Sequence, residues 1–201
     1  MSAALPVFIG AFVFGYLCGS IPFGLLLTRL TGAGDLRKIG SGNIGATNVL
    51  RTGRKGLAIA TLALDAFKAW FAVTVVFHFF GPDPTYLAAF GAMLGHAYPI
   101  WLKFKGGKAV ACGFGVILAL SPILVIYCLV LFVGIVALTR FVSLGSIVTA
   151  AAAGPLAWYT GHYHLIELYV VIGGLVVLWH HENIARLFKG QENRFQWSRK
   201  T

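Results

Sequence analysis

Three polar stretches of the chain carry residue types that could bind an anion and move a proton. The first begins at Gly40 and ends at Asn48, with an arginine three residues later; its candidate residues are Gly40, Ser41, Gly42, Asn43, Gly45, Thr47, Asn48 and Arg51. Glycines let backbone N–H groups approach a ligand, and an arginine can bind an oxyanion through two hydrogen bonds. The stretch is neither a Walker A loop nor a G-x-G-x-x-G fingerprint. It predicts either an anion-binding loop or a flexible polar loop between helices.

The second stretch, Gly95 to Lys108, combines a histidine with lysines and a glycine pair. Gly106, Gly107 and Lys108 open the next apolar segment, with Lys105 just before them, so free N–H groups and an ammonium group would meet at a helix start. His96 lies just inside the expected membrane edge, where an ionisable group is a candidate for function. Two alternatives stay open: the lysines only orient the chain in the membrane, and His96 only bonds a neighbouring helix.

The third stretch lies near the C-terminus. His180, Asn183 and Arg186 are three residues apart, which predicts one strip of a helix, and Glu192 follows after Gly190. The alternative is a solvated helix end with a glycine stop. Asp65 and Lys68 are also three apart, in the middle of an apolar segment, where a structural and a functional role are both open.

The elements that must position these stretches are membrane helices. Of the 201 residues, 58% are hydrophobic and only 11% are charged, and the mean hydropathy is +0.82. Soluble domains carry about 25% charged residues. The net charge of +10 lies mostly in short loops between apolar runs, where basic residues set the orientation of a membrane protein, and no nucleic-acid-binding pattern occurs among them.

The sequence predicts an all-α integral membrane protein with about seven spans, forming one domain over residues 1–201. The expected spans are Leu5–Leu30, Gly56–Phe80, Thr85–Leu102, Val110–Leu120, Pro122–Leu138, Ser143–Thr160 and His164–His180. A break at Ser121 and Pro122 is expected because proline cannot continue a helix. With that break, every basic cluster falls on one side, which favours an outside N-terminus, a cytoplasmic C-terminus and all three polar stretches at the cytoplasmic face.

The three stretches together resemble the motifs of the bacterial acyl-phosphate:glycerol-3-phosphate acyltransferases, small multi-pass enzymes of phospholipid synthesis. The first matches G-S-x-N-x-G-x-x-N, the second G-H-x-x-P…F-x-G-G-K, and the third H-x-x-N-I-x-R-L-x-x-G-x-E. The segment from Arg140 to Leu144 also resembles the family, and the resemblance runs in order over nearly the whole chain. The departures are alanines where the family commonly has glycine, at Ala69 and Ala109, and the neighbours Trp179 and His181 around His180.

The resemblance implies transfer of an acyl group from acyl phosphate to the sn-1 hydroxyl of glycerol 3-phosphate, giving lysophosphatidic acid and phosphate. We expect direct attack by the hydroxyl, with His96 or a substrate phosphate taking the proton, because no convincing Ser-His-Asp set is present. The residues expected to act in catalysis are Ser41, Asn43, His96, Lys108 and Asn183. The remaining candidates of the three stretches, with His180, Arg186 and Glu192, would bind the substrates and their phosphates.

The resemblance further implies a place in the bacterial cytoplasmic (inner) membrane, lipid and the two substrates as partners, and no cofactor, metal or nucleic acid. The main alternative is a transporter of a phosphorylated metabolite, whose site should lie at the bilayer midplane on broken helices. A lipid-binding assembly factor is a third class. The segment from His78 to Asp83 has the H-x-x-x-x-D spacing of a different acyltransferase superfamily, but the expected topology places it on the outer face.

Overall fold

The chain folds into helices without strands over residues 4–195, the part that the computed structural model describes. Long apolar runs favour helices in a membrane because a helix satisfies all of its backbone hydrogen bonds internally. The α-helices of this part are α1 (Ala4–Gly19), α2 (Phe23–Leu30), α3 (Ala46–Leu50), α4 (Lys55–Phe80), α5 (Pro82–Ala97), α6 (Val110–Leu120), α7 (Pro122–Thr139), α8 (Val142–Tyr159), α9 (Ile166–Trp179) and α10 (His181–Phe188). Three short 3₁₀ turns join them, at Leu36–Lys38, Ile100–Leu102 and Tyr163–Leu165.

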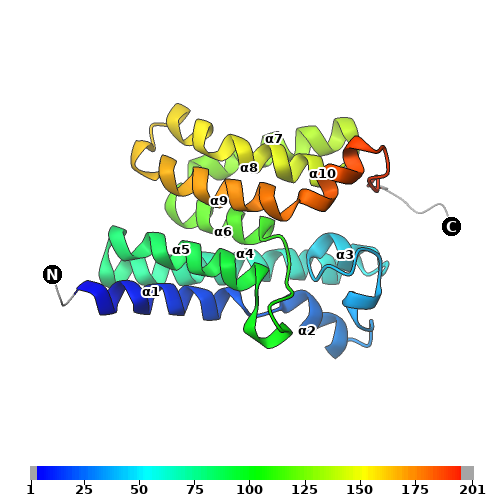
Figure 1. The fold of residues 1–201 in the computed structure, drawn as a ribbon, viewed down its shortest axis with the longest axis horizontal. Helices are drawn as coiled ribbons and strands as arrows, with labels where there is room; N and C mark the ends of the chain where they lie inside the picture. The colour runs from blue at the N-terminus through cyan, green and yellow to red at the C-terminus, as the bar shows by residue number, and fades with distance from the viewer. Residues whose placement is uncertain (1–3, 196–201) are drawn as a thin grey trace. The chain divides into compact units, whose positions relative to one another are not determined.

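The helices form two compact units, which divide between Leu120 and Ser121. The first holds α1 to α6 and the second α7 to α10 (Figure 1). The break expected at Ser121 is confirmed, since α6 ends just before it and α7 begins just after it. The expected single domain over the whole chain stays a prediction.

Four helical stretches among the described residues are long and apolar enough to cross a bilayer: Ala4–Leu30, Lys55–Phe80, Pro122–Thr139 and Val142–Tyr159. A fifth results if Tyr163–Trp179 and His181–Phe188, which are bent by 59°, count as one span. The seven expected spans and the expected orientation of the termini therefore stay predictions.

The first and third expected spans differ most from the structure. The first span is not one continuous helix, because the chain breaks between Gly19 and Phe23, where Pro22 lacks the N–H that a helix needs. The third span was expected to reach Leu102, but α5 ends at Ala97. The cause is Pro99, which disfavours a helical conformation in the residue before it.

In the first unit, α1 and α5 lie side by side (Figure 1) and touch through glycines on both helices. A Cβ atom added to Gly19 would lie 2.1 Å from the Ala92 carbonyl oxygen, and one added to Gly95 would lie 2.2 Å from that of Tyr16. Helices approach this closely in membranes when small residues line the contact. The same device recurs in the second unit, where Gly173 of α9 faces the carbonyl of Ala150 in α8.

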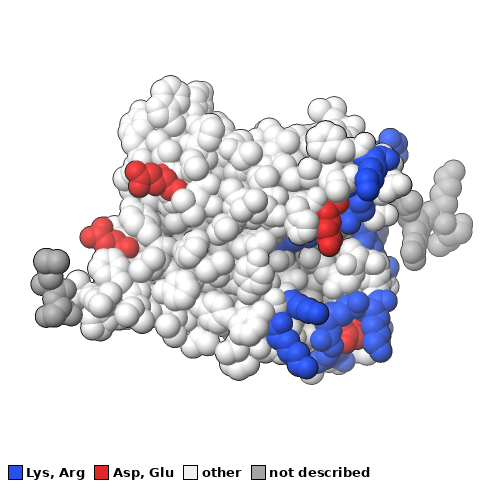
Figure 2. Space-filling view, in the orientation of Figure 1, with Lys and Arg blue, Asp and Glu red and all other residues white. Residues whose placement is uncertain are grey.

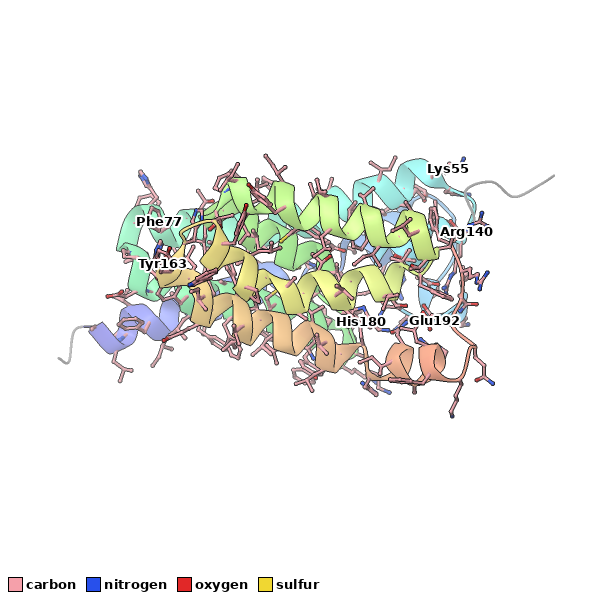
Figure 3. All side chains as sticks on the ribbon, turned by 90° about the horizontal axis from the view of Figure 1, so that it is seen from above. Lys55, Phe77, Arg140, Tyr163, His180 and Glu192 are labelled. Atoms are coloured by element: carbon pink, nitrogen blue, oxygen red, sulfur yellow. The ribbon has the colours of Figure 1, made fainter. Side chains whose placement is uncertain are left out.

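Basic side chains gather at one end of each unit. In the first unit, Lys and Arg side chains cluster around α2 and α3 (Figure 2). Lys55 and Phe77 mark opposite ends of α4 in Figure 3. In the second unit, Arg140, His180 and Glu192 lie toward one end and Tyr163 toward the other. Within each unit, this gathering of basic side chains at one end is the charge asymmetry expected of a membrane-spanning bundle.

Candidate active site

The first polar stretch is a loop built around Asn48, which is 2% exposed. Its amide nitrogen donates to three backbone carbonyl oxygens, those of Leu36 (3.0 Å), Ile39 (2.9 Å) and Asn43 (2.8 Å). Its side-chain oxygen accepts the backbone N–H of Ser41 at 3.2 Å and lies 3.5 Å from Nη1 of Arg51. The Asn48 side chain thus supplies hydrogen bonds to loop backbone groups that have no partner in a helix or strand.

The same loop depends on two glycines with positive φ. Gly40 has φ +54° and Gly42 has φ +70°, a region that costs other residues about 1–2 kcal/mol. A Cβ on Gly40 would lie 2.5 Å from Asn48 Oδ1 and 2.8 Å from Arg51 Cδ. Gly40 therefore allows the arginine to lie across the loop beside the backbone of Ser41.

The remaining candidates of this loop take different positions. Asn43 accepts the backbone N–H of Gly45 through its side chain at 2.9 Å, so this amide shapes the turn into α3. Ser41 and Thr47 are exposed, and Arg51 is partly buried. Ser41 and Arg51 can therefore present polar groups to a ligand, while Asn48 holds them in place.

A further residue supports the loop, and sequence reasoning gave it no role. Asp35 accepts hydrogen bonds from Arg37, from its backbone N–H at 3.0 Å and from its guanidinium Nε at 2.9 Å, and from Arg29 at 3.4 Å. The hydrogen bonds from Arg37 hold the pKa of the Asp35 carboxyl well below its ordinary value. The signal was an aspartate directly before a short basic helical turn, the usual capping arrangement.

The second polar stretch folds back on the end of α5. The backbone N–H of Gly106 donates to the Ala97 carbonyl and that of Gly107 to the His96 carbonyl, both at 3.0 Å. The expectation that these two N–H groups are free for a phosphate is therefore wrong in this structure. Both glycines are instead needed for close approach, because a Cβ on Gly107 would lie 2.1 Å from His96 Nε2.

Lys108 directly follows this glycine pair and precedes an unusual backbone position. Ala109 is fully buried and has φ +55°, and α6 begins only at Val110. The left-handed conformation at Ala109 gives a physical reason for the glycine that related sequences were expected to have there. Lys105 is exposed and Lys108 is partly buried on this segment.

His96 lies inside the first unit and is 4% exposed. Its Nδ1 is 3.7 Å from Oδ1 of Asp65, which also forms an ion pair with Lys68 at 2.7 Å. The Asp65 and Lys68 pair expected from the sequence is therefore present, and His96 lies beside it.

The third polar stretch surrounds Glu192, in the second unit. One of its carboxylate oxygens accepts from Asn183 Nδ2 at 2.7 Å and from Ser143 Oγ at 2.9 Å, and the other accepts from Arg186 Nε at 2.7 Å. Burial acts to raise the pKa of Glu192, but the hydrogen bonds from Arg186, Asn183 and Ser143 outweigh it and leave the pKa below its ordinary value. Sequence reasoning missed Ser143, because it lies 49 residues from Glu192 in the chain.

The expected strip of three residues on one helix is wrong in one respect. α9 ends at Trp179 and α10 begins at His181, so His180 lies in the bend, while Asn183 and Arg186 share α10. The helix axis therefore changes direction at His180, and this residue does not share a helical face with Asn183 and Arg186. His180 donates from Nδ1 to the Val176 carbonyl oxygen at 2.7 Å.

A metal site and the H-x-x-x-x-D spacing are two further features to compare with the structure. No three His, Cys, Asp or Glu side chains of residues 4–195 lie together as metal ligands would. His78 stacks edge-on against Phe79 near the end of α4, opposite to Lys55. It lies about 35 Å along the helix from the loop of the first stretch, which argues against a role for the H-x-x-x-x-D spacing.

Comparisons with known proteins show the family of the chain. The family profile described as glycerol-3-phosphate acyltransferase matches residues 9–190. The chain belongs to the glycerol-3-phosphate acyltransferase family. It is thus an acyltransferase of phospholipid synthesis and an integral membrane protein.

Individual members of the family are similar over almost their full length. The glycerol-3-phosphate acyltransferase of Rhodopseudomonas palustris (strain BisB5) is 52% identical over 189 residues, which cover 94% of this chain and 96% of the relative. That of Methylorubrum extorquens (strain PA1) is 48% identical over 194 residues, covering 96% of both chains.

A solved structure extends the likeness to the fold. The chain resembles the crystal structure of PlsY (YgiH), an integral membrane glycerol 3-phosphate acyltransferase, in its glycerol 3-phosphate form, with a TM-score of 0.89 and 36% identity. The alignment covers 94% of this chain and 96% of that one. The lysophosphatidic acid form of the same protein aligns with a TM-score of 0.87.

Proposed function

We propose that the chain transfers an acyl group from acyl phosphate to the sn-1 hydroxyl of glycerol 3-phosphate, giving lysophosphatidic acid and inorganic phosphate. The observation that carries this proposal is the likeness, over nearly the whole chain, to a membrane acyltransferase solved with glycerol 3-phosphate and with lysophosphatidic acid. Those two molecules are an acceptor and its acylated product. The acyl phosphate donor is implied by the resemblance of the three polar stretches to the family's motifs.

The chemistry of the donor suits the side chains of this protein. Acyl phosphate is a mixed anhydride with a good leaving group, so the reaction needs positioning and charge stabilisation more than a strong base or a covalent intermediate. The hydroxyl of glycerol 3-phosphate attacks the acyl carbon, the bond from that carbon to the phosphate oxygen breaks, and phosphate leaves with the electron pair.

The phosphate groups require cations and hydrogen-bond donors. In the first unit, Arg51 and Lys108 would neutralise phosphate charge, and Ser41 is exposed, with its backbone N–H on the same Asn48 oxygen that the arginine approaches. In the second unit, Asn183 and Arg186 are held at Glu192, and His180 lies in the bend just before α10. We propose these groups as the substrate-binding and catalytic residues.

Of the two proton acceptors expected from the sequence, the structure favours a substrate phosphate. The His96 ring is almost fully buried between Asp65 and the backbone of Gly107. A general base must reach the proton that it removes, at about 2.6–3.2 Å or through one water. We therefore assign His96 to positioning and the proton to the phosphate of glycerol 3-phosphate.

The proposed location in the cell rests on the distribution of charge. The basic ends of the two units fit the cytoplasmic surface of a bacterial inner membrane, where glycerol 3-phosphate is soluble and the acyl donor can enter from the lipid. The transporter alternative has no observation in its favour. Uptake of glycerol 3-phosphate into sealed proteoliposomes without a donor would revive it.

Donor choice and the role of Lys108 can be tested together. Purified wild type, Lys108→Ala and Lys103→Ala are supplied with glycerol 3-phosphate and either palmitoyl phosphate or palmitoyl-CoA. Lys103 lies on the same loop and is exposed, so its replacement removes the same charge outside the proposed site. We expect product only from palmitoyl phosphate, a loss of about 100-fold in Lys108→Ala, and nearly wild-type turnover in Lys103→Ala. Equal losses in both variants would remove Lys108 from the mechanism.

A further inference from the structure

Three ionisable side chains lie together inside the first unit: Asp65 and Lys68 of α4 and His96 of α5. Their exposed fractions are 2%, 3% and 4%. Lys68 Nζ is 2.7 Å from Asp65 Oδ1, and His96 Nδ1 is 3.7 Å from the same oxygen. A buried ion pair adds little stability over apolar side chains of the same volume, because both charges lose their hydration. Its presence inside a membrane helix therefore calls for another role.

One side of this cluster holds the second polar stretch. The His96 carbonyl accepts the N–H of Gly107, and the His96 ring fills the space that a Gly107 side chain would need. Asp65 faces the other ring nitrogen, and the backbone carbonyl of Asp65 accepts a hydrogen bond from the Cys112 thiol of α6 at 3.2 Å. The chain is thus held on either side of Lys108 by groups close to Asp65, at Gly107 through His96 and at Cys112 in α6.

The other side of the cluster holds the first polar stretch. Lys68 Nζ donates to the Ile21 carbonyl at 2.6 Å, in the break between α1 and α2. This bond fixes the start of α2, where Gly24 packs so closely on the loop that a Cβ would lie 2.1 Å from the Ile44 carbonyl oxygen. Ile44 is 3% exposed and lies in the centre of the first polar stretch.

We propose that Asp65 and Lys68 are positioning residues for the binding of glycerol 3-phosphate, which act by holding the Gly40–Arg51 loop and the Gly106–Lys108 segment in register. Lys68 sets the first through Ile21 and α2, and Asp65 sets the second through His96. The inference rests on the proposed function, since it names the phosphate-bearing acceptor as the ligand. In this role, neither Asp65 nor Lys68 needs to touch the substrate.

The test separates positioning from stability with a double-mutant cycle. Asp65→Asn and Lys68→Met each leave one buried charge without its partner, whereas the double variant removes both charges. His96→Gln is a further variant that leaves the ion pair intact. Thr85→Val is the control, because Thr85 is fully buried, bonds the Gly81 carbonyl, and lies at the other end of α5 from His96.

Each variant is measured in detergent for its thermal midpoint, for the Kd of glycerol 3-phosphate by calorimetry, and for the KM of both substrates. We expect the single variants to unfold at lower temperature and the double variant to recover most of the loss. The Kd and KM for glycerol 3-phosphate should stay raised by about tenfold or more in the double variant and in His96→Gln, with the KM for palmitoyl phosphate little changed. Thr85→Val should lower only the thermal midpoint.

Wild-type affinity for glycerol 3-phosphate in the double variant would overturn the inference. So would a rise in Thr85→Val as large as in the cluster variants, since the effect would then follow stability alone. The calorimetric Kd keeps this question apart from the proposed function. A wild type that binds glycerol 3-phosphate but transfers no acyl group contradicts the reaction and leaves the positioning role to be judged by Kd, and a wild type that does not bind it overturns both.

Discussion

Arg186 Nε donates to Oε2 of Glu192 at 2.7 Å, and this ion pair ties the last described helix to the segment that follows it. The other carboxylate oxygen accepts hydrogen bonds from Asn183 and Ser143. Because both oxygens of Glu192 are occupied within the protein, the carboxylate holds other side chains in place and is a poor candidate for direct contact with a phosphate. Glu192 was expected among the substrate-binding residues, and we now propose it as the organiser of that group.

We expect Glu192→Gln to lower the free energy of unfolding by about 2 kcal/mol, since Arg186 loses a charged partner. Turnover should fall as well, because Asn183 is no longer held. The control is Glu182→Gln, which removes an exposed carboxylate at 3.7 Å from the same arginine and should change little. Thermal unfolding in detergent and initial rates measure both effects. Equal behaviour of the two variants would contradict the role given to Glu192.

The acid stability of the protein should depend on the same residue. The folded-state pKa of Glu192 lies below its ordinary value. The stabilisation it provides is thus complete above the ordinary pKa of a glutamate, about 4.3, and is lost as pH falls through the lower folded-state value. We expect the thermal midpoint of Glu192→Gln to fall less steeply than that of wild type below about pH 4. Parallel curves for the two proteins would show that another carboxyl governs this range.

Asn48 should be the most sensitive residue of the first polar stretch. Asn48→Asp places an oxygen where an amide nitrogen now faces three carbonyl oxygens, and it buries a charge. We expect a loss of about 3 kcal/mol of stability and an activity too low to measure. Asn193→Asp makes the same chemical change at an exposed position and should have little effect on either. An active, stable Asn48→Asp would mean that the loop does not depend on this side chain.

Much of the architecture could be predicted from the sequence, because hydropathy and proline positions report on local backbone. The break at Ser121 is confirmed for this reason, and so is the all-helical membrane fold. The break before Phe23 was missed although Pro22 marks it, because the apolar run continues through it. The early end of α5 was missed in the same way at Pro99.

The internal partners of the site were harder to predict, because they depend on contacts between distant segments. Lys68 meets the Ile21 carbonyl across 47 residues, and Ser143 meets Glu192 across 49. Motif spacing singled out these polar residues but could not separate exposed ones, such as Ser41, from those, such as Asn48, that hold the loop. The N–H groups of Gly106 and Gly107 were expected to be free for the same reason.

Ala109 offers a stabilising substitution. Its φ of +55° costs an alanine about 1–2 kcal/mol, so Ala109→Gly should raise the thermal midpoint or leave it unchanged despite the greater freedom of glycine in the unfolded chain. Ala111→Gly, two residues later inside α6, should instead lower stability by about 1 kcal/mol. Destabilisation of the same size in both variants would argue against the left-handed conformation at Ala109.

Two glycines of α1 should respond oppositely to the same change. Gly19→Ala drives a methyl group into the Ala92 carbonyl and should cost about 2 kcal/mol or more. Gly10→Ala meets no atom within 4 Å and should be neutral or stabilising by about 0.5–1 kcal/mol, since alanine favours the helix. Thermal midpoints in detergent measure the contrast. Similar midpoints for the two variants would contradict the close packing of α1 on α5.

The central claim is transfer of the acyl group from acyl phosphate to the sn-1 hydroxyl of glycerol 3-phosphate. The most direct measurement supplies the purified protein with palmitoyl phosphate and glycerol 3-phosphate, follows phosphate release and lysophosphatidic acid together, and assigns the acylated carbon by NMR. The account predicts equal amounts of both products, with the acyl group at sn-1. Phosphate release without acylated glycerol 3-phosphate, or acylation only from a thioester donor, would contradict it.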